Sequence, residues 1–192
     1  MNNLEILKAL NLEIFTRDEL TEISKGVEKD LNILIYAKKE FNYSQMEQIR
    51  LGLESNVDVS IYAKPDYNEY QMTQIRIGLE KDLDISIYAK PEYTWFQMKE
   101  IRLGLEKNLD VSVYAKPEFS YRKMAVIREG LEKELEVSIY AKPEMDLEIM
   151  NFIKEKLIPL RNKRKLNIRK SAENFKELSN EEQLTKIREG LK

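Results

Sequence analysis

The sequence contains no cysteine and no histidine among its 192 residues. Without cysteine there are no disulfide bonds, no thiol catalysis and no cysteine-based zinc sites. Without histidine the chain lacks the commonest general base and the commonest metal ligand. P-loop, dinucleotide-binding and serine-hydrolase motifs are absent as well. We therefore expect a protein that is not an enzyme and that uses no cofactor and no metal ion.

Long apolar runs and strong net charge are also missing. No stretch of about 18 apolar residues occurs, so we expect no transmembrane helix and no membrane partner. The first residues carry acids and no small-residue cleavage site, unlike a signal peptide. The 32 Lys and Arg residues nearly balance the 34 Asp and Glu residues. These features predict a soluble protein.

A repeat of 26 residues dominates what is present. The units are a degenerate copy near 15–34, four gapless copies at 35–60, 61–86, 87–112 and 113–138, and a fifth at 139–157 that decays. We expect an N-terminal cap before them, so that residues 1–157 form one solenoid. A basic insertion at 158–178 then precedes a terminal repeat helix at 179–192. One unit cannot bury its own apolar face, whereas stacked units can.

The first half of each copy predicts an α-helix. Three copies begin with capping boxes, at Asn42–Gln45, Asn68–Gln71 and Thr94–Gln97. The fourth copy has Ser120 and Lys123, and the lysine cannot accept the second bond of the box. All six glycines recur at one mid-helix position, where we expect close approach of two helices. Asn56 and Asn108 follow the helices where a left-handed residue is expected.

The second half of each copy, of the form D-V-S-I-Y-A-K-P, admits two interpretations. Asp58 at a cap position and Pro65 at the end favour a short second helix. The alternation of β-branched Val59 and Ile61 with polar residues favours a strand. The helix is the preferred interpretation and predicts an all-α solenoid of stacked helix–turn–short-helix units. The strand would instead produce an α/β solenoid like the leucine-rich repeats.

The string Q-M-x-x-I-R-x-G-L-E-x-x-L-D-V-S-x-Y-A-x-P resembles a short repeat of uncharacterised proteins from Gram-positive bacteria and their phages and plasmids. The resemblance covers residues 15–150 and the C-terminal copy. It implies a cytoplasmic protein of a bacterial host cell, with an accessory role on a mobile element. Inhibition of a host defence system, of the anti-CRISPR or anti-restriction type, is one such role. The resemblance implies no common activity.

Residues that recur are explained first by stacking of the units. Each repeat arginine precedes a glutamate by four residues, as in Arg50 and Glu54, which predicts an ion pair within the helix. The alternative is an arginine ladder that follows phosphates. The repeat tyrosines, such as Tyr62, are interpreted as core residues with the hydroxyl at the rim, the alternative being a platform for nucleobases.

Residues that differ between copies are the better candidates for partner binding. The first helical turns carry large aromatic residues that stacking would place on one ridge. The candidate partner-binding residues are Tyr43, Tyr70, Trp95, Phe96, Tyr121 and Arg122. Trp, Tyr and Arg dominate the hot spots of protein interfaces. The alternative is that these rings pack against the neighbouring unit.

The insertion concentrates positive charge. Its candidate residues for binding nucleic acid or an acidic protein surface are Arg161, Lys163, Arg164, Lys165, Arg169 and Lys170. The alternative is a mobile linker. The sequence thus predicts a non-catalytic protein-binding repeat module, with a nucleic-acid-binding module as the alternative function. A homodimer through the C-terminal helix is a further hypothesis.

Overall fold

The computed structural model describes residues 5, 7–8 and 11–176. The α-helices are α2 (Arg17–Glu28), α3 (Tyr43–Glu54), α4 (Glu69–Glu80), α5 (Trp95–Glu106), α6 (Tyr121–Glu132) and α7 (Leu147–Lys176). Single turns of 3-10 helix lie between them: η1 (Leu12–Ile14), η2 (Ile33–Ile35), η3 (Val59–Ile61), η4 (Ile85–Ile87), η5 (Val111–Val113) and η6 (Val137–Ile139). No strand occurs in these described residues. The all-α solenoid is therefore confirmed, and the leucine-rich-repeat-like alternative is wrong.

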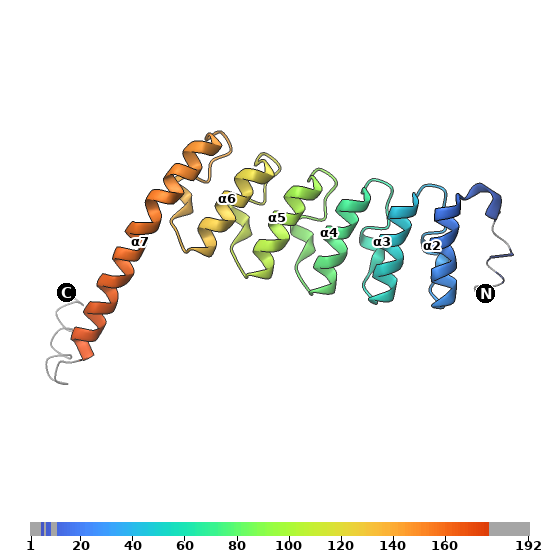
Figure 1. Cartoon of the computed structure of the whole chain (residues 1–192), viewed down its shortest axis with the longest axis horizontal. Coiled ribbons are helices and arrows are strands. Elements are labelled where there is room, and N and C mark those ends of the chain that lie inside the picture. Colours follow the sequence, from blue (N-terminus) through green and yellow to red (C-terminus); the bar gives the residue numbers. More distant parts are fainter. Residues whose placement is uncertain (1–4, 6, 9–10, 177–192) are drawn as a thin grey trace.

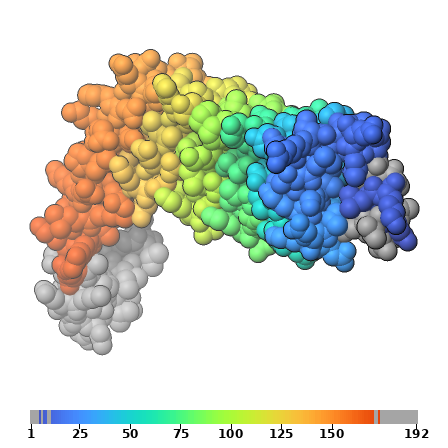
Figure 2. All heavy atoms as spheres, turned by 45° about the vertical axis from the view of Figure 1, so that its right-hand side comes forward, coloured from blue at the N-terminus to red at the C-terminus, as the bar shows by residue number. Residues whose placement is uncertain are grey.

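Helices α2 to α6 stand side by side in one row, each packed against the next (Figure 1). Because every copy repeats the same elements in the same order, neighbouring α-helices run in the same direction. Their amino-terminal ends therefore meet along one edge of the row. Helix α7 packs on α6 and extends past the row, as the space-filling view in Figure 2 also shows. The units form an open stack in which each one contacts its neighbours.

Local caps determine where each α-helix begins. Reciprocal capping boxes join Thr16 with Glu19, Asn42 with Gln45, Asn68 with Gln71, and Thr94 with Gln97. In α6 the Ser120 hydroxyl accepts from the Lys123 amide at 3.4 Å, and no second bond closes the box. The Lys123 ammonium donates instead to the Pro143 carbonyl at 2.6 Å. The predicted half-box of the fourth copy is confirmed.

The second half of each copy is one turn of 3-10 helix. In η3 the Asp58 carboxylate accepts from the amide of Ser60 at 3.0 Å and from its hydroxyl at 2.6 Å. The turn ends at Tyr62, whose amide bonds to the Val59 carbonyl at 3.1 Å. Pro65 follows closely and disfavours continued helix in the residue before it. The prediction of a short helix is confirmed, and its brevity explains the 3-10 form.

A left-handed residue ends each helix from α2 to α6. These residues are Asp30, Asn56, Asp82, Asn108 and Glu134, with φ between 53° and 55°. In the copy that begins with α3, the Val57 amide then bonds back to the Gly52 carbonyl at 3.0 Å, which completes a Schellman motif. The expectation for Asn56 and Asn108 is confirmed. The acidic residues at the same position were missed because this conformation favours Gly and Asn.

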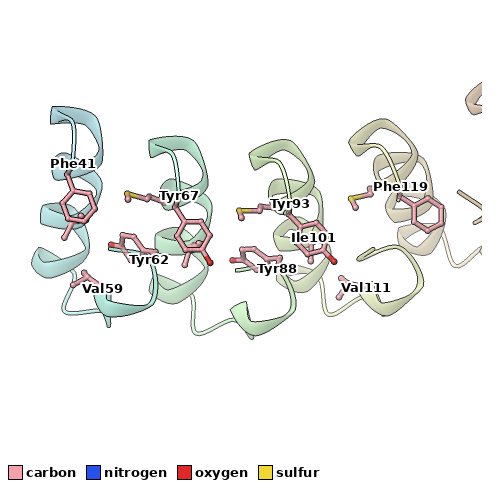
Figure 3. Packing of buried hydrophobic residues seen from close by; sticks show 14 of the residues in the cluster. Phe41, Val59, Tyr62, Tyr67, Tyr88, Tyr93, Ile101, Val111 and Phe119 are labelled. Carbon is pink, nitrogen blue, oxygen red and sulfur yellow. The ribbon is translucent and has the colours of Figure 1, made fainter. Parts of the chain in front are cut away.

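The repeat glycine lets the short helix approach the long one closely, as predicted, because a Cβ atom on Gly52 would lie 2.8 Å from Val59 of η3. It also makes room for the tyrosine that follows η3. A Cβ atom on Gly52 would lie 1.9 Å from the Tyr62 hydroxyl oxygen. That ring turns back from η3 onto α3, where its hydroxyl donates to the Gln48 carbonyl at 3.0 Å. Tyr62 and Tyr88 occupy the same place in successive units (Figure 3). Both are fully buried, so the prediction of core tyrosines is confirmed, whereas the prediction of a hydroxyl at the rim is wrong.

Buried polar side chains join each unit to the next. The Gln71 amide donates to the Tyr93 carbonyl at 2.7 Å while its oxygen closes the capping box of α4. The Tyr93 hydroxyl donates to the Ala115 carbonyl at 2.7 Å. Gln45 and Tyr67 make the equivalent bonds one unit earlier. These bonds fix the register of the stack, because each donor meets a carbonyl of the following unit.

The repeat arginines also join the units. Each pairs with the glutamate four residues later, as predicted: Arg50–Glu54, Arg76–Glu80, Arg102–Glu106 and Arg128–Glu132. Each also donates backward through Nε to the preceding helix, and Arg50 reaches Glu22 at 2.8 Å. Burial raises the pKa of Glu22, but hydrogen bonds from Lys25 and Arg50 outweigh burial and hold that pKa below its ordinary value.

The two ends of the stack differ from its middle. Helix α7 has 30 residues and continues through Pro159, so residues 158–176 of the predicted insertion are helical. At about 1.5 Å per residue the helix is about 45 Å long. The predicted terminal helix at 179–192 lies outside the described residues, as does much of the N-terminal cap. Within that cap, η1 is described, and Leu7 packs against the core.

Candidate partner-binding site

The recurring arginines and tyrosines are occupied inside the stack. Arg50 and Arg102 are buried, and both join neighbouring helices. The tyrosine rings are fully buried, and burial raises the pKa of Tyr140 to about 12 and that of Tyr88 further. A neutral, buried tyrosine presents no ring face to a nucleobase. The interpretation of the arginine and tyrosine ladders as a phosphate and base platform has no support in this geometry.

Four of the residues that differ between copies form one exposed stack of rings, here called the aromatic ladder: Tyr70, Trp95, Phe96 and Tyr121. Their ring centroids lie 5.4 Å apart for Tyr70 and Trp95, 3.6 Å for Trp95 and Phe96, and 4.7 Å for Phe96 and Tyr121. The interplanar angles are 21° to 29°. Each stacked pair contributes about 0.5–1.5 kcal/mol beyond its buried area. The ladder therefore holds its own shape without a ligand.

The ladder crosses three units at the amino-terminal edge of the row. Its residues belong to the first turns of α4, α5 and α6. Tyr70 is 54% exposed and Phe96 is 40% exposed, whereas Trp95 and Tyr121 are half-buried. The rings thus expose their outer edges to solvent and cover one another's faces. They do not pack into the neighbouring unit's core.

The two remaining residues of the predicted ridge lie at its borders. Arg122 is exposed and lies over the Tyr121 ring, with its guanidinium carbon 5.7 Å from the centroid, and its Nε donates to the Tyr121 hydroxyl at 3.2 Å. Tyr43, on the first turn of α3, is 51% exposed and stacks on no ring of the described residues. The structure therefore brings together five of the six predicted residues.

A hollow of about 450 Å³ lies beside the middle of the ladder. Trp95, Phe96 and Pro91 line it, and Glu92 is the one charged residue in its wall. The Glu92 carboxylate is exposed and forms no ion pair with another described side chain. The hollow thus combines aromatic surface with a negative charge. Glu92 was not among the predicted site residues, although its position beside Pro91 in the loop before Trp95 was a usable signal.

Glu92 belongs to a row of acids that recurs with the repeat. The equivalent residues are Glu40 before α3, Asp66 before α4, Glu118 before α6 and Glu144 before α7, all exposed. Of these, Glu40 lies 3.9 Å from the ammonium of Lys38. The repeat lysine in each of these loops does not share the hollow, since Lys90 lines a separate groove of about 500 Å³ with Leu105 and Leu109. The edge that carries the ladder therefore also carries one carboxylate per unit.

The basic candidates lie on α7, and half of them are paired. Arg161 and Lys165 both contact the Glu134 carboxylate, the former at 3.0 Å. Hydrogen bonds from these two cations lower the pKa of Glu134. Arg169 pairs with Glu173 at 2.9 Å. The cations that form no ion pair within the described part of the chain are exposed: Lys163, Arg164 and Lys170.

The described part of the chain holds neither a cluster of metal ligands nor a membrane-spanning helix. Among residues 5, 7–8 and 11–176, no group of three or more acidic side chains is placed to hold a metal ion. None of the helices in that part of the chain combines the length and the apolarity needed to cross a membrane. Comparison with protein-family models, with curated proteins and with solved structures finds no match to this chain.

Proposed function

We propose that this protein is a non-catalytic binding module that recognises another protein through the aromatic ladder. The observation that carries the proposal is a continuous stack of four rings on three adjacent helices, of which Tyr70 and Phe96 are exposed and Trp95 and Tyr121 are half-buried. The helices beneath are joined by buried hydrogen bonds, so the rings sit on a rigid base. Rigid aromatic side chains lose little conformational entropy on binding and are frequent hot spots.

The ring geometry favours a protein over a nucleobase as the ligand of the ladder. A base stacks on an open ring face. In the ladder the neighbouring rings cover both faces of Trp95 and Phe96, with centroids 3.6 Å to 5.4 Å apart. The exposed edges, together with the Tyr70 hydroxyl, suit an irregular surface with both apolar and polar groups.

The resemblance of the repeat to proteins of phages and plasmids supports a more concrete role. We propose that the partner is a component of a bacterial defence system, blocked in the cytoplasm of the host cell. An anti-CRISPR or anti-restriction factor needs no reaction of its own, because covering a functional surface is sufficient. Capture of a defence enzyme from the host would support this role, and capture of unrelated proteins would contradict it.

The experiment is an affinity capture from host lysate with two variants beside the wild type. The variant Trp95→Ala with Phe96→Ala removes the centre of the ladder, and Tyr43→Ala removes an exposed ring outside it. We expect the double variant to lose at least tenfold in affinity, because hot spots contribute about 2 kcal/mol or more. Tyr43→Ala should bind normally. Unchanged binding of the double variant would refute the proposal.

A second candidate function is nucleic-acid binding by α7. The unpaired, exposed cations Lys163, Arg164 and Lys170 support it. Such binding should weaken steeply with salt and vanish when Lys163 and Arg164 are changed to glutamate. Binding through the ladder should tolerate both salt and nuclease treatment. Capture that survives nuclease would therefore favour the ladder.

The homodimer through the C-terminal helix is a separate proposal. The predicted helix at 179–192 lies outside the described residues, and the proposal is that it pairs with the same helix of a second copy in a two-fold dimer. Sedimentation at tens of micromolar tests it directly. A monomer at that concentration would exclude it.

A further inference from the structure

We infer that the aromatic ladder binds a basic, extended peptide segment of its partner, with positively charged side chains at every third residue. This inference rests on the proposed function and specifies the chemistry of the partner. Three features of the ladder edge carry it. They are the composition of the hollow beside Trp95, the recurrence of acids along the edge, and the spacing of the units.

The residues that line the hollow suit a cationic side chain. Its wall combines the aromatic rings of Trp95 and Phe96 with the carboxylate of Glu92. The aliphatic part of an arginine or lysine packs on aromatic surface, while its charged end stays near a carboxylate. Since Glu92 pairs with no described cation, its charge is available to a ligand.

The spacing of the acids matches a polyproline II helix. Asp66 and Glu92 occupy equivalent positions in adjacent units. The ring centroids of Tyr70 and Phe96, at equivalent positions of the same two units, are joined through Trp95 by 5.4 Å and 3.6 Å, so they lie no more than 9.0 Å apart. This agrees with the spacing of about 8–10 Å between the axes of packed helices. A polyproline II helix returns to the same face every three residues, about 9.3 Å. A peptide in this conformation, lying along the ladder, therefore brings every third side chain to a carboxylate.

Other extended conformations match less well. Side chains of a β-strand return to the same face every two residues, about 6.6 Å, so successive cations would fall out of step with the acids. In an α-helix, side chains on one face recur with each turn, after a rise of about 5.4 Å, and this rise is also shorter than the spacing of the acids. Aromatic surfaces also suit polyproline II segments, which carry no internal hydrogen bonds and pay little ordering entropy.

One residue limits the register of the peptide. Arg122 lies at the α6 end of the ladder and keeps its charge against Tyr121. A cation bound beside it would be repelled. The peptide therefore places its cations opposite Asp66 and Glu92 and a neutral or acidic residue near Arg122. Replacing Arg122 with glutamine should raise the affinity for an all-basic peptide.

The test uses the full chain and two labelled peptides of twelve residues. Each peptide contains three arginines and nine prolines, spaced every three residues in one and every four in the other. Fluorescence anisotropy measures binding, and the emission of Trp95 reports on the site. We expect the three-residue spacing to bind more tightly, and Glu92→Gln to weaken it about two- to fivefold, as for an exposed ion pair. Glu144→Gln, at the equivalent position away from the ladder, should change nothing.

The outcomes separate this inference from the proposed function. Equal binding of the two peptides, or equal effects of Glu92→Gln and Glu144→Gln, would overturn the basic-peptide inference. So would a lack of peptide binding while a captured partner still depends on Trp95 and Phe96, and in that case the proposed function would stand. If a partner binds the Trp95→Ala, Phe96→Ala variant normally, the proposed function itself fails.

Discussion

Replacing Gly78 with alanine tests what glycine does in the middle of the repeat helix. A Cβ atom at this position would lie 1.9 Å from the Tyr88 hydroxyl oxygen and 2.7 Å from a methyl carbon of Ile85. The Tyr88 ring is fully buried, and its hydroxyl donates to the Gln74 carbonyl at 3.1 Å. The added methyl group must therefore displace the turn η4 from α4.

The expected change in the free energy of unfolding is the sum of three contributions, and the first opposes the other two. Alanine is the better helix former by about 1 kcal/mol, which stabilises the variant. Overpacking of a well-filled core costs about 1–3 kcal/mol. Loss of the buried hydroxyl bond costs about 1 kcal/mol more. The free energy of unfolding should therefore fall by about 1–3 kcal/mol, opposite in sign to the effect of helix propensity alone.

Urea unfolding followed by far-ultraviolet circular dichroism measures this change. The companion variants are Tyr88→Phe and the double variant with Gly78→Ala. In Tyr88→Phe the hydroxyl oxygen that would lie nearest the alanine methyl group is absent. Gly78→Ala should therefore lower the free energy of unfolding by less in the Tyr88→Phe protein than in the wild type. A Gly78→Ala protein that is more stable than the wild type would refute the explanation. An alanine penalty that is equal in both backgrounds would exclude the hydroxyl as its cause.

Three further predictions concern the bonds between units. Tyr140→Phe should cost about 1 kcal/mol less in urea unfolding than Tyr88→Phe, because the buried Tyr140 hydroxyl has no hydrogen-bond partner in the described structure. Arg102→Leu should lower the unfolding free energy by about 1–3 kcal/mol, and the exposed Arg122→Leu by less than about 0.5 kcal/mol; equal losses would contradict the role of Arg102 between units. Acid should destabilise the fold below about pH 4.5, because the pKa of Glu22 is lower in the folded state than in the unfolded state. Such a carboxylate stabilises the fold at a pH above its unfolded pKa. This contribution is lost as the pH falls through the folded pKa. Glu22→Gln should reduce that slope in acid titrations of stability.

The features that could be predicted from the sequence depend on neighbours along the chain. A capping box joins residues three apart, so Asn68 and Gln71 predict the start of α4 directly. The Asp58 cap and Pro65 likewise bracket the short helix. The side-by-side placement of the ladder residues followed from the repeat, because stacking brings equivalent positions together.

The features that were missed depend on distances that only the folded stack sets. Gly52 meets Tyr62 because η3 turns back onto α3, and its position in the helix alone does not show this. The Gln71 amide bonds to a carbonyl 22 residues away in the next unit. Helix α7 continues through Pro159, although proline disfavours a helix interior by about 3 kcal/mol. The stacking of Trp95 on Phe96 was also unforeseen, because adjacent residues on a helix do not face each other.

We propose that recurring residues hold the units together and that the aromatic residues that differ between copies bind the partner. Trp95 is the only tryptophan in the chain, so its fluorescence reports on the ladder alone. The most direct measurement is acrylamide quenching of Trp95 with and without the captured partner. The partner should shield Trp95 in a saturable manner, at the concentrations where calorimetry detects binding. Saturated binding with unchanged quenching would contradict the claim.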